Sequence, residues 1–173
     1  MKEQLSGLET TVNELRSELR SQNLQVKNAN VTRPDASFKF ELTDVSKFLK
    51  TSTNKHYSHR FWCRGLLWSF HVESQLGLNK NVCSRYLGFS LHCEHNDPVK
   101  RSCKAEFQLT LFSKLLGKPN YVYRTSYNFH QKANWGHPLF RSYDELTDKK
   151  NGYIEDDKIL LGVELKTEPL TRD

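Results

Sequence analysis

The apolar positions of residues 1–27 recur at alternating spacings of three and four. The seam consists of Leu5, Leu8, Val12, Leu15, Leu19, Gln22 and Val26, with Glu, Arg, Ser and Asn on the other faces. A helix that packs on its own domain normally has a broader apolar stripe, whereas a narrow a/d seam over about four heptads favours self-association. We therefore predict a coiled-coil helix over residues 1–27, with Leu5, Leu8, Val12, Leu15, Leu19 and Val26 as its oligomerisation residues.

After a polar segment with one proline, residues 28–36, which we interpret as a linker, the apolar period changes to two. Alternating runs include FKFEL, LLWSFHVES, YLGFSLHC, CKAEFQLTLF, NYVYRTSYNF and DKILLGVELKT, with turn-rich segments between them. In the run LLWSFHVES, Trp68, Phe70 and Val72 share one face, and the last run places Ile159, Leu161, Val163 and Leu165 on one side. About eight short strands of this kind predict an all-β, antiparallel β-sandwich over residues 37–168, followed by a tail, residues 169–173. No long helix separates the strands, which excludes an α/β fold.

Two segments interrupt the alternation. The sequence TDVSKFLKTS is the one helical candidate, and Thr43 is its expected N-cap. The run NWGHPLFRSYDEL is interpreted as a packing corner, in which Trp135 and Phe140 are apolar anchors. Gly136 would allow an unusual backbone angle there, and Pro138 would stiffen the path of the chain.

The chain has 173 residues, enough for one domain and an appendage, and its formal net charge is +6. This mild excess permits an acidic partner without requiring one. No apolar run approaches the ~20 residues that span a bilayer, and the N-terminus lacks the apolar segment of a secretory signal. We expect a cytoplasmic protein.

The four cysteines, Cys63, Cys83, Cys93 and Cys103, form no C-x-x-C pair and are expected to be reduced thiols on strands. His92 and His95 flank Cys93, but this segment has a single thiol and no second ligand pair follows, so no metal site is predicted.

Catalytic motifs are missing from the sequence, which has no G-x-S-x-G, no H-E-x-x-H and no glycine-rich phosphate loop. The acidic pair Asp156 and Asp157 is interpreted as turn capping rather than acid–base chemistry. We therefore predict a protein that is not an enzyme and needs no cofactor.

One segment, YVYRTSYNFHQK, interleaves aromatic residues with Arg124, His130 and Lys132, as a sheet that binds single-stranded nucleic acid would. The same alternation is explained by one face in the core and one in water, and no dense basic stripe accompanies it. Nucleic-acid binding is kept as an alternative.

Six segments in order, SFKFELTDVSKF, HRFWCRGLLWSFHV, YLGFSLHCE, KAEFQLTLF, WGHPLFRSYDEL and NGYIEDDKILLGVELK, resemble the meprin and TRAF homology (MATH, or TRAF-C) domain over residues 36–167. The resemblance implies a groove that holds an extended peptide beside an exposed strand. A coiled coil directly before such a domain is the arrangement of the TNF-receptor-associated factors, and it implies a homotrimer.

The resemblance also implies which residues line the groove. Compared with the branch that includes the speckle-type POZ protein, Phe107, Tyr127 and Trp135 match aromatic groove residues, Ser90 and His137 replace aromatic residues, and Asn134 replaces an aspartate. Alternation also places Phe107 in the core. On the receptor-binding branch, an Arg and Tyr pair of the third strand is replaced here by His71 and Glu73. An exposed His137 would make peptide contacts sensitive to pH near about 6 to 7.

Together these observations and the resemblance predict an oligomeric adaptor whose sandwich binds short extended peptides of partner proteins. The resemblance alone implies a place in ubiquitin-linked or receptor signalling. A scaffold used for protein assembly, with a degenerate groove, is the first alternative, and the nucleic-acid-binding β-domain is the second.

Overall fold

The computed structural model describes residues 12, 15–16, 33–51, 55–79, 82–94, 101–130 and 132–172. Of the predicted oligomerisation residues, Leu5, Leu8, Leu19 and Val26 lie outside the described residues. Val12 and Leu15 are helical and exposed. Self-association through residues 1–27 therefore stays a prediction.

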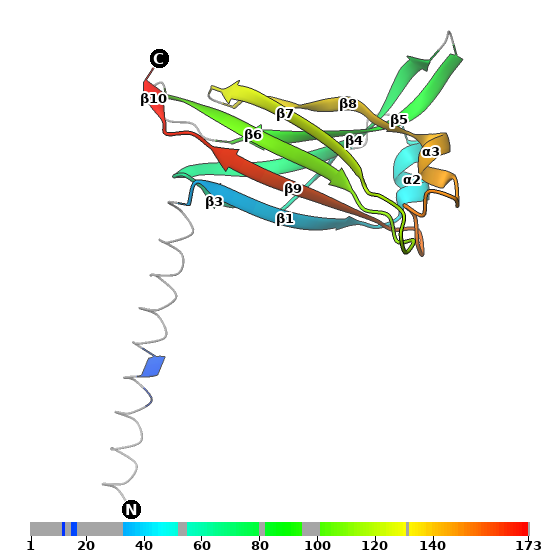
Figure 1. Ribbon diagram of the computed structural model, residues 1–173, viewed down its shortest axis with the longest axis horizontal. Helices are drawn as coiled ribbons and strands as arrows, with labels where there is room; N and C mark the ends of the chain where they lie inside the picture. The colour runs from blue at the N-terminus through cyan, green and yellow to red at the C-terminus, as the bar shows by residue number, and fades with distance from the viewer. Residues whose placement is uncertain are drawn as a thin grey trace, which may run out of the picture.

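The described part of the chain forms two antiparallel five-stranded sheets packed face to face (Figure 1). The first sheet contains β1 (Asp35–Leu42), β9 (Ile159–Thr167), β6 (Arg101–Leu111), β7 (Tyr121–Phe129) and β10 (Thr171–Arg172). The second contains β2 (Lys55–Tyr57), β3 (Phe61–Cys63), β4 (Leu66–Asn79), β5 (Val82–Cys93) and β8 (Asn134–Ser142). The predicted antiparallel sandwich is confirmed, and its strands begin at Asp35 and extend to Arg172, slightly beyond the predicted limits.

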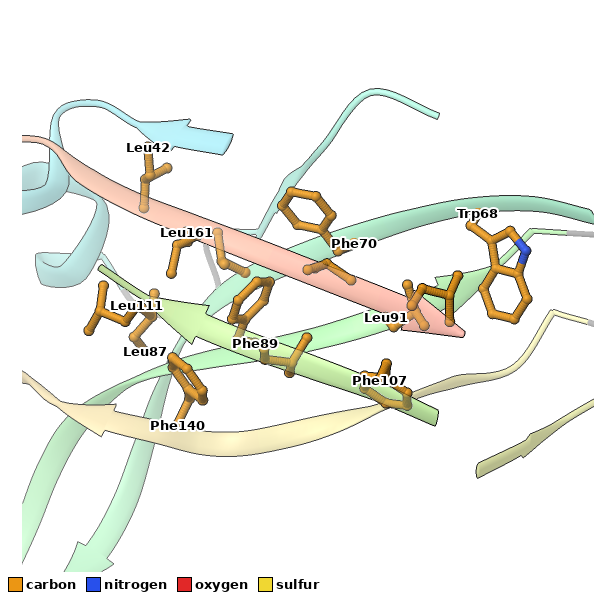
Figure 2. Close-up of a cluster of buried hydrophobic side chains, with 14 of the residues drawn as sticks. Leu42, Trp68, Phe70, Leu87, Phe89, Leu91, Phe107, Leu111, Phe140 and Leu161 are labelled. Carbon is orange, nitrogen blue, oxygen red and sulfur yellow. The ribbon is translucent and has the colours of Figure 1, made fainter. Parts of the chain in front are cut away.

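The inner faces of the sheets follow the alternation in the sequence. Trp68, Phe70 and Val72 of β4 are at most 2% exposed, and Leu161 of β9 is fully buried. Figure 2 shows Trp68, Phe70 and Leu161 together with labelled residues of β5, β6 and β8 between the sheets. Burial of one such side chain contributes roughly 1.5–3 kcal/mol to folding, so the period-two pattern is sufficient to fix which face of each strand points inward.

Helix α2 (Val45–Lys50) begins one residue later than predicted. Its N-cap is Asp44 rather than Thr43, and the Asp44 side chain makes no capping hydrogen bond. The acceptor comes instead from the turn before β9, where a carboxylate oxygen of Asp157 accepts hydrogen bonds from Ser46 N at 2.8 Å and Ser46 Oγ at 2.6 Å. These bonds lower the pKa of Asp157. Because a residue far away in sequence supplies the acceptor, Thr43 does not cap the helix.

A second helix, α3 (Tyr143–Thr147), was not predicted. Ser142 and Glu145 form a capping box, in which each side chain bonds the backbone N–H of the other residue. The S-x-x-E signal was present in the sequence. A helix of five residues is too short to show a 3.6-residue apolar period, and for that reason the pattern analysis missed it.

The run beginning at Asn134 is a strand, β8, and not a corner. Gly136 is required for a close approach of backbones: a Cβ atom there would lie 2.3 Å from Phe89 O and 2.4 Å from Ser90 Cα. Pro138 lies in a bulge, because the register passes from Phe89 opposite His137 to Leu87 opposite Arg141. A bulge accommodates a residue without an N–H in a sheet.

No helix among the described residues has the length and apolar character needed to cross a membrane.

Replacement of Asp157 by Gly is expected to lower the free energy of unfolding by about 1 kcal/mol, because the N-cap acceptor of α2 is lost. Glycine tolerates the positive φ of 56° at this position, so the change adds no backbone strain. Asp156→Gly is the matched control, since Asp156 has a φ of 48° in the same turn and makes no hydrogen bond to α2 in the described structure. Urea unfolding measures both variants, and equal loss of stability would contradict the capping role.

Candidate peptide-binding site

Strands β7 and β8 form neighbouring outer edges of the two sheets (Figure 1). Within the described structure, β7 pairs only with β6 and β8 pairs only with β5. An edge strand presents unpaired N–H and C=O groups at every second residue, and these can pair with an additional strand. The region between the two edges is therefore the first place to look for a peptide site.

The two edges are joined by a pair of stacked aromatic rings. Tyr127 of β7 and Trp135 of β8 lie with ring centroids 4.4 Å apart and ring planes 6° apart. Both side chains point inward from their sheets, since Tyr127 is opposite the buried Ala105 and Trp135 is opposite the buried Leu91. The resemblance-based prediction named both residues, and the structure brings them into contact.

The stack is oriented by one further contact. The indole Nε1–H of Trp135 donates a hydrogen bond to Thr125 Oγ1 at 3.4 Å. Trp135 is nevertheless 43% exposed. A large, oriented aromatic surface that remains accessible is a suitable contact for an apolar ligand side chain.

Core aromatic residues lie beneath the stack. Phe129 is edge-on to Tyr127 at 5.1 Å, and Phe107 lies 5.9 Å from Phe129. Phe107 is 4% exposed and belongs to the core, as strand alternation predicted. It supports the stack from below and does not form its exposed surface.

His137 lies two residues along β8 from Trp135 and contacts a second tyrosine. Its ring is edge-on to Tyr123 at 4.8 Å, and it is half-buried. Burial lowers the pKa of His137 below the ordinary value of an imidazole. The predicted window for pH-sensitive contacts, about 6 to 7, therefore moves to lower pH.

Ser90 and Asn134 lie on the other face of the second sheet. Ser90 is opposite Gly136, and Asn134 is opposite His92, so their side chains point away from the aromatic stack. The predicted site residues thus divide into an inner group, Phe107, Tyr127, Trp135 and His137, and an outer pair. We call the inner residues Thr125, Tyr127, Trp135 and His137 the edge site; Trp135 is exposed and the other three are half-buried.

On the outer face, Ser90 hydrogen-bonds the ring of His71, with Oγ 3.1 Å from Nε2. His71 is only 4% exposed, because Tyr57 lies over it with a centroid distance of 5.3 Å. Burial lowers the pKa of His71; the carboxylate of Glu73 opposes this shift, and Lys55 reinforces it. Glu73 is itself paired with Lys55 at 3.4 Å.

Sequence analysis did not single out Thr125, which belongs to the edge site, or Tyr123, which contacts His137 of that site. Each alternates with the exposed residues of β7, so the alternation was a sufficient signal for their direction. The sequence did not indicate which residues these two side chains would contact, because contacts between β7 and β8 depend on how the two sheets pack.

The described residues also include side chains of the types that ligate metals or act as nucleophiles. No group of three or more His, Cys, Asp or Glu side chains among them is arranged to hold a metal ion. Burial raises the pKa of Cys63, and it raises that of Cys103 to about 12, so these thiols stay protonated and are poor nucleophiles.

Because the pKa values of His71 and His137 are lowered in the folded state, the unfolded chain binds more protons below neutral pH. The free energy of unfolding should fall as pH drops below about 6.5, the ordinary imidazole pKa, and level off below the folded-state values. Urea unfolding at several pH values measures this slope, which His71→Gln and His137→Gln should each reduce. An unchanged slope in both variants would contradict the burial argument.

Comparison with known proteins agrees with the fold. The family model described as "MATH domain" matches residues 37–165. The chain is 24% identical over 139 residues to ubiquitin carboxyl-terminal hydrolase 7 of Caenorhabditis elegans, covering 74% of this chain and 12% of that protein. It is 28% identical over 130 residues to ubiquitin C-terminal hydrolase 12 of Arabidopsis thaliana, covering 75% of this chain and 11% of that protein.

The chain therefore spans 11–12% of the length of these relatives. A solved structure, the Salmonella enterica trimeric lipoprotein SadB, aligns over 98% of this chain and 80% of that chain at 9% identity, but its TM-score of 0.35 supports no argument about fold or function. The family match covers most of the chain and nearly all of the sandwich, and the chain belongs to the MATH domain family.

Proposed function

We propose that this MATH domain binds extended segments of partner proteins along the free edge of β7, with a ligand side chain against the edge site. The observation that carries the proposal is the Tyr127–Trp135 stack, an exposed and oriented aromatic surface directly beside an unpaired strand edge. Main-chain pairing would supply affinity, and the aromatic surface would supply selectivity.

Strand β7 is better suited than β8 to receive a ligand strand. It runs through YVYRTSYNF, with neither glycine nor proline. Strand β8 carries Gly136 and Pro138 and is bulged, and each of these features disfavours pairing with a further strand.

The adaptor part of the proposal rests on the family and on the N-terminal sequence. The segment of this chain that contains the MATH domain is similar to ubiquitin hydrolases from an animal and a plant. This similarity supports a role as a protein-interaction module in ubiquitin-linked or receptor signalling. We propose a non-catalytic, cytoplasmic protein. The heptads of residues 1–27 would assemble a homotrimer, and linked copies of a weak site gain avidity.

Assembly through a degenerate groove is the second candidate. It is favoured by the positions that depart from the receptor-binding pattern, since His71 is buried and Glu73 is paired with Lys55. Neither side chain is available to a ligand without rearrangement. The nucleic-acid alternative has less support, because Tyr123, Thr125 and Tyr127 point toward β8 and not toward an open sheet face.

Peptides selected by the full chain from a displayed random library, about 12 residues long, test the peptide-binding proposal. Trp135→Ala is expected to weaken the binding of a selected synthetic peptide by about 10-fold or more, because a large aromatic contact is removed. Fluorescence anisotropy measures the affinity. Trp62→Ala is the matched control, since Trp62 is 48% exposed on β3, away from the edge site.

Methylation of alternate peptide amides separates strand addition from simple aromatic contact. Amides that face β7 should lose binding when methylated, and their neighbours should tolerate it. Failure to select any peptide, or equal losses with Trp135→Ala and Trp62→Ala, would contradict the proposal in favour of the assembly scaffold.

Light scattering of the full chain and of a version that begins at Asn28 tests the oligomer. We expect a trimer for the full chain and a monomer for the shortened one, because the apolar seam lies within residues 1–27. Two monomers would show that the N-terminal segment is not an oligomerisation device.

A further inference from the structure

Two loops meet at one end of the sandwich, beside α3 (Figure 1). The first, residues 113–120, joins β6 to β7, and the second, residues 148–152, follows α3. They are held together by a hydrogen bond from Lys114 N to Gly152 O at 2.7 Å. We call these two segments the end loops. Because the backbones are bonded to each other, the side chains of both loops belong to one surface.

The first end loop exposes two consecutive leucines. Leu115 is 46% exposed, and Leu116 is fully exposed. Gly117, with a φ of 76°, closes a tight turn in which Lys118 N donates to Leu115 O at 3.2 Å. The leucines therefore stand at the tip of a convex turn. A single exposed leucine is ordinary on a protein surface, so these two gain their meaning from the charges around them.

Four lysines share this surface: Lys114, Lys118, Lys149 and Lys150. All four are exposed, and none forms an ion pair within the described part of the chain. The one acidic residue of the end loops is Asp148, whose carboxylate accepts a hydrogen bond from Lys150 N at 2.9 Å. Four lysines and one aspartate give the end loops a net charge of +3.

Acidic side chains that flank the end loops are engaged with other groups. Glu145 of α3 pairs with Arg141 at 2.8 Å. Asp157, in the turn before β9, accepts hydrogen bonds from Ser46. The positive charge of the end loops is therefore left for a partner outside the chain.

An apolar tip flanked by free lysines matches the chemistry of a lipid bilayer with anionic head groups. Such a bilayer presents negative charge at its surface and an apolar layer directly beneath it. It needs no complementary pocket, so a convex turn is a suitable shape for it. A nucleic acid would attract the lysines equally well, but its phosphates offer no apolar environment to Leu116.

We propose that the end loops form a membrane-docking site, in which Leu115 and Leu116 enter the interface of an anionic bilayer and the four lysines contact its head groups. Neither contribution is sufficient for stable attachment alone, and the two together supply the pair of signals that peripheral binding requires.

The location of the end loops is compatible with the rest of the molecule. The register of the first sheet places Leu111 and Tyr121, which border the first end loop, at the opposite end of the sheet from Asp35. The chain enters the domain at Asp35, so residues 1–27 and the docking site would lie at opposite ends. The end loops share no residue with the edge site, and the inference does not rest on peptide binding.

Sedimentation of the full chain with vesicles tests the inference. Binding is expected to phosphatidylcholine vesicles that contain about 30% phosphatidylserine and not to phosphatidylcholine alone, because the lysines require a negative surface. Raising the salt from about 0.1 M to about 1 M should release the protein, because the Debye length falls from about 10 Å to about 3 Å.

Leu116→Ser is expected to weaken binding to the phosphatidylserine vesicles by about 10-fold or more, because an apolar contact with lipid is lost. Lys149→Gln combined with Lys150→Gln is expected to weaken it by about 10-fold to 30-fold, since each lysine near an anionic surface contributes about 5-fold. Thermal unfolding should be unchanged in both variants, because these side chains are exposed.

Each change has a matched control elsewhere in the chain. Leu78→Ser removes a leucine that is 75% exposed on the β4–β5 hairpin. Lys132→Gln combined with Lys166→Gln removes two exposed lysines, one between β7 and β8 and one on β9 opposite Asp35. Both controls should bind the vesicles as the wild type does.

Three results would overturn the inference. The first is equal sedimentation, or none, with the two kinds of vesicle. The second is equal weakening by the end-loop variants and their controls. The third is weakening by the lysine changes but not by Leu116→Ser, which would identify attraction by charge alone and favour an acidic protein or a nucleic acid as the partner. Peptide selection and its dependence on Trp135 test the proposed function separately, so each can fail without the other.

Discussion

The arrangement of the two free edges depends on the burial of Phe140 between the sheets. This side chain is 1% exposed and contacts Phe89 of β5 at 5.3 Å and Tyr121 of β7 at 5.0 Å. It therefore links the second sheet, to which it belongs, with the edge strand of the first. Figure 2 shows Phe140 beside Phe89 and Leu87 within this core. His137 against Tyr123 at 4.8 Å and Arg141 over the Tyr121 ring at 3.9 Å continue this link between β8 and β7, and together these contacts set the separation of the stacked rings.

The bulge in β8 makes this link compatible with the edge site. Trp135 and His137 point inward by strict alternation, and continued alternation would place residue 139 inward and Phe140 outward. The extra residues around Pro138 shift the phase, so Phe140 also points inward. Gly136 and Gly88 permit the close backbone approach that the bulge requires, since a Cβ at Gly88 would lie 2.7 Å from Pro138 O. The W-G-x-x-x-F run thus encodes one irregular strand that directs three rings to the same side.

Sequence patterns predicted the sandwich and the directions of most side chains because burial and strand period are local properties. The alternation of β4 and β9 was sufficient to identify their core faces, and it also placed Phe107 inward. The predictions that were wrong concern features that depend on residues distant in sequence. The acceptor for α2 comes from Asp157, far along the chain, and the glycine and proline of β8 concealed a strand that β5 stabilises. The burial of His71 could not be predicted for the same reason. Alternation places it on the polar outer face of the second sheet, but Tyr57 covers it.

The edges of the first sheet differ in a way that bears on selectivity. Strand β1 is the other outer strand, but Phe38 stacks on Phe61 at 4.0 Å and Phe40 packs on His56 at 5.1 Å, so residues of β3 and β2 close the sandwich beside it. At β7 the corresponding closure consists of the Tyr127–Trp135 pair, of which Trp135 stays exposed. Phe38 is nevertheless 37% exposed, so part of an aromatic ring is accessible at the β1 edge as well as at β7. The two edges therefore differ in chemistry rather than in exposure, because a phenylalanine pair closes one edge, whereas the tyrosine and tryptophan at the other carry polar groups, of which the indole N–H is bonded to Thr125 Oγ1 at 3.4 Å.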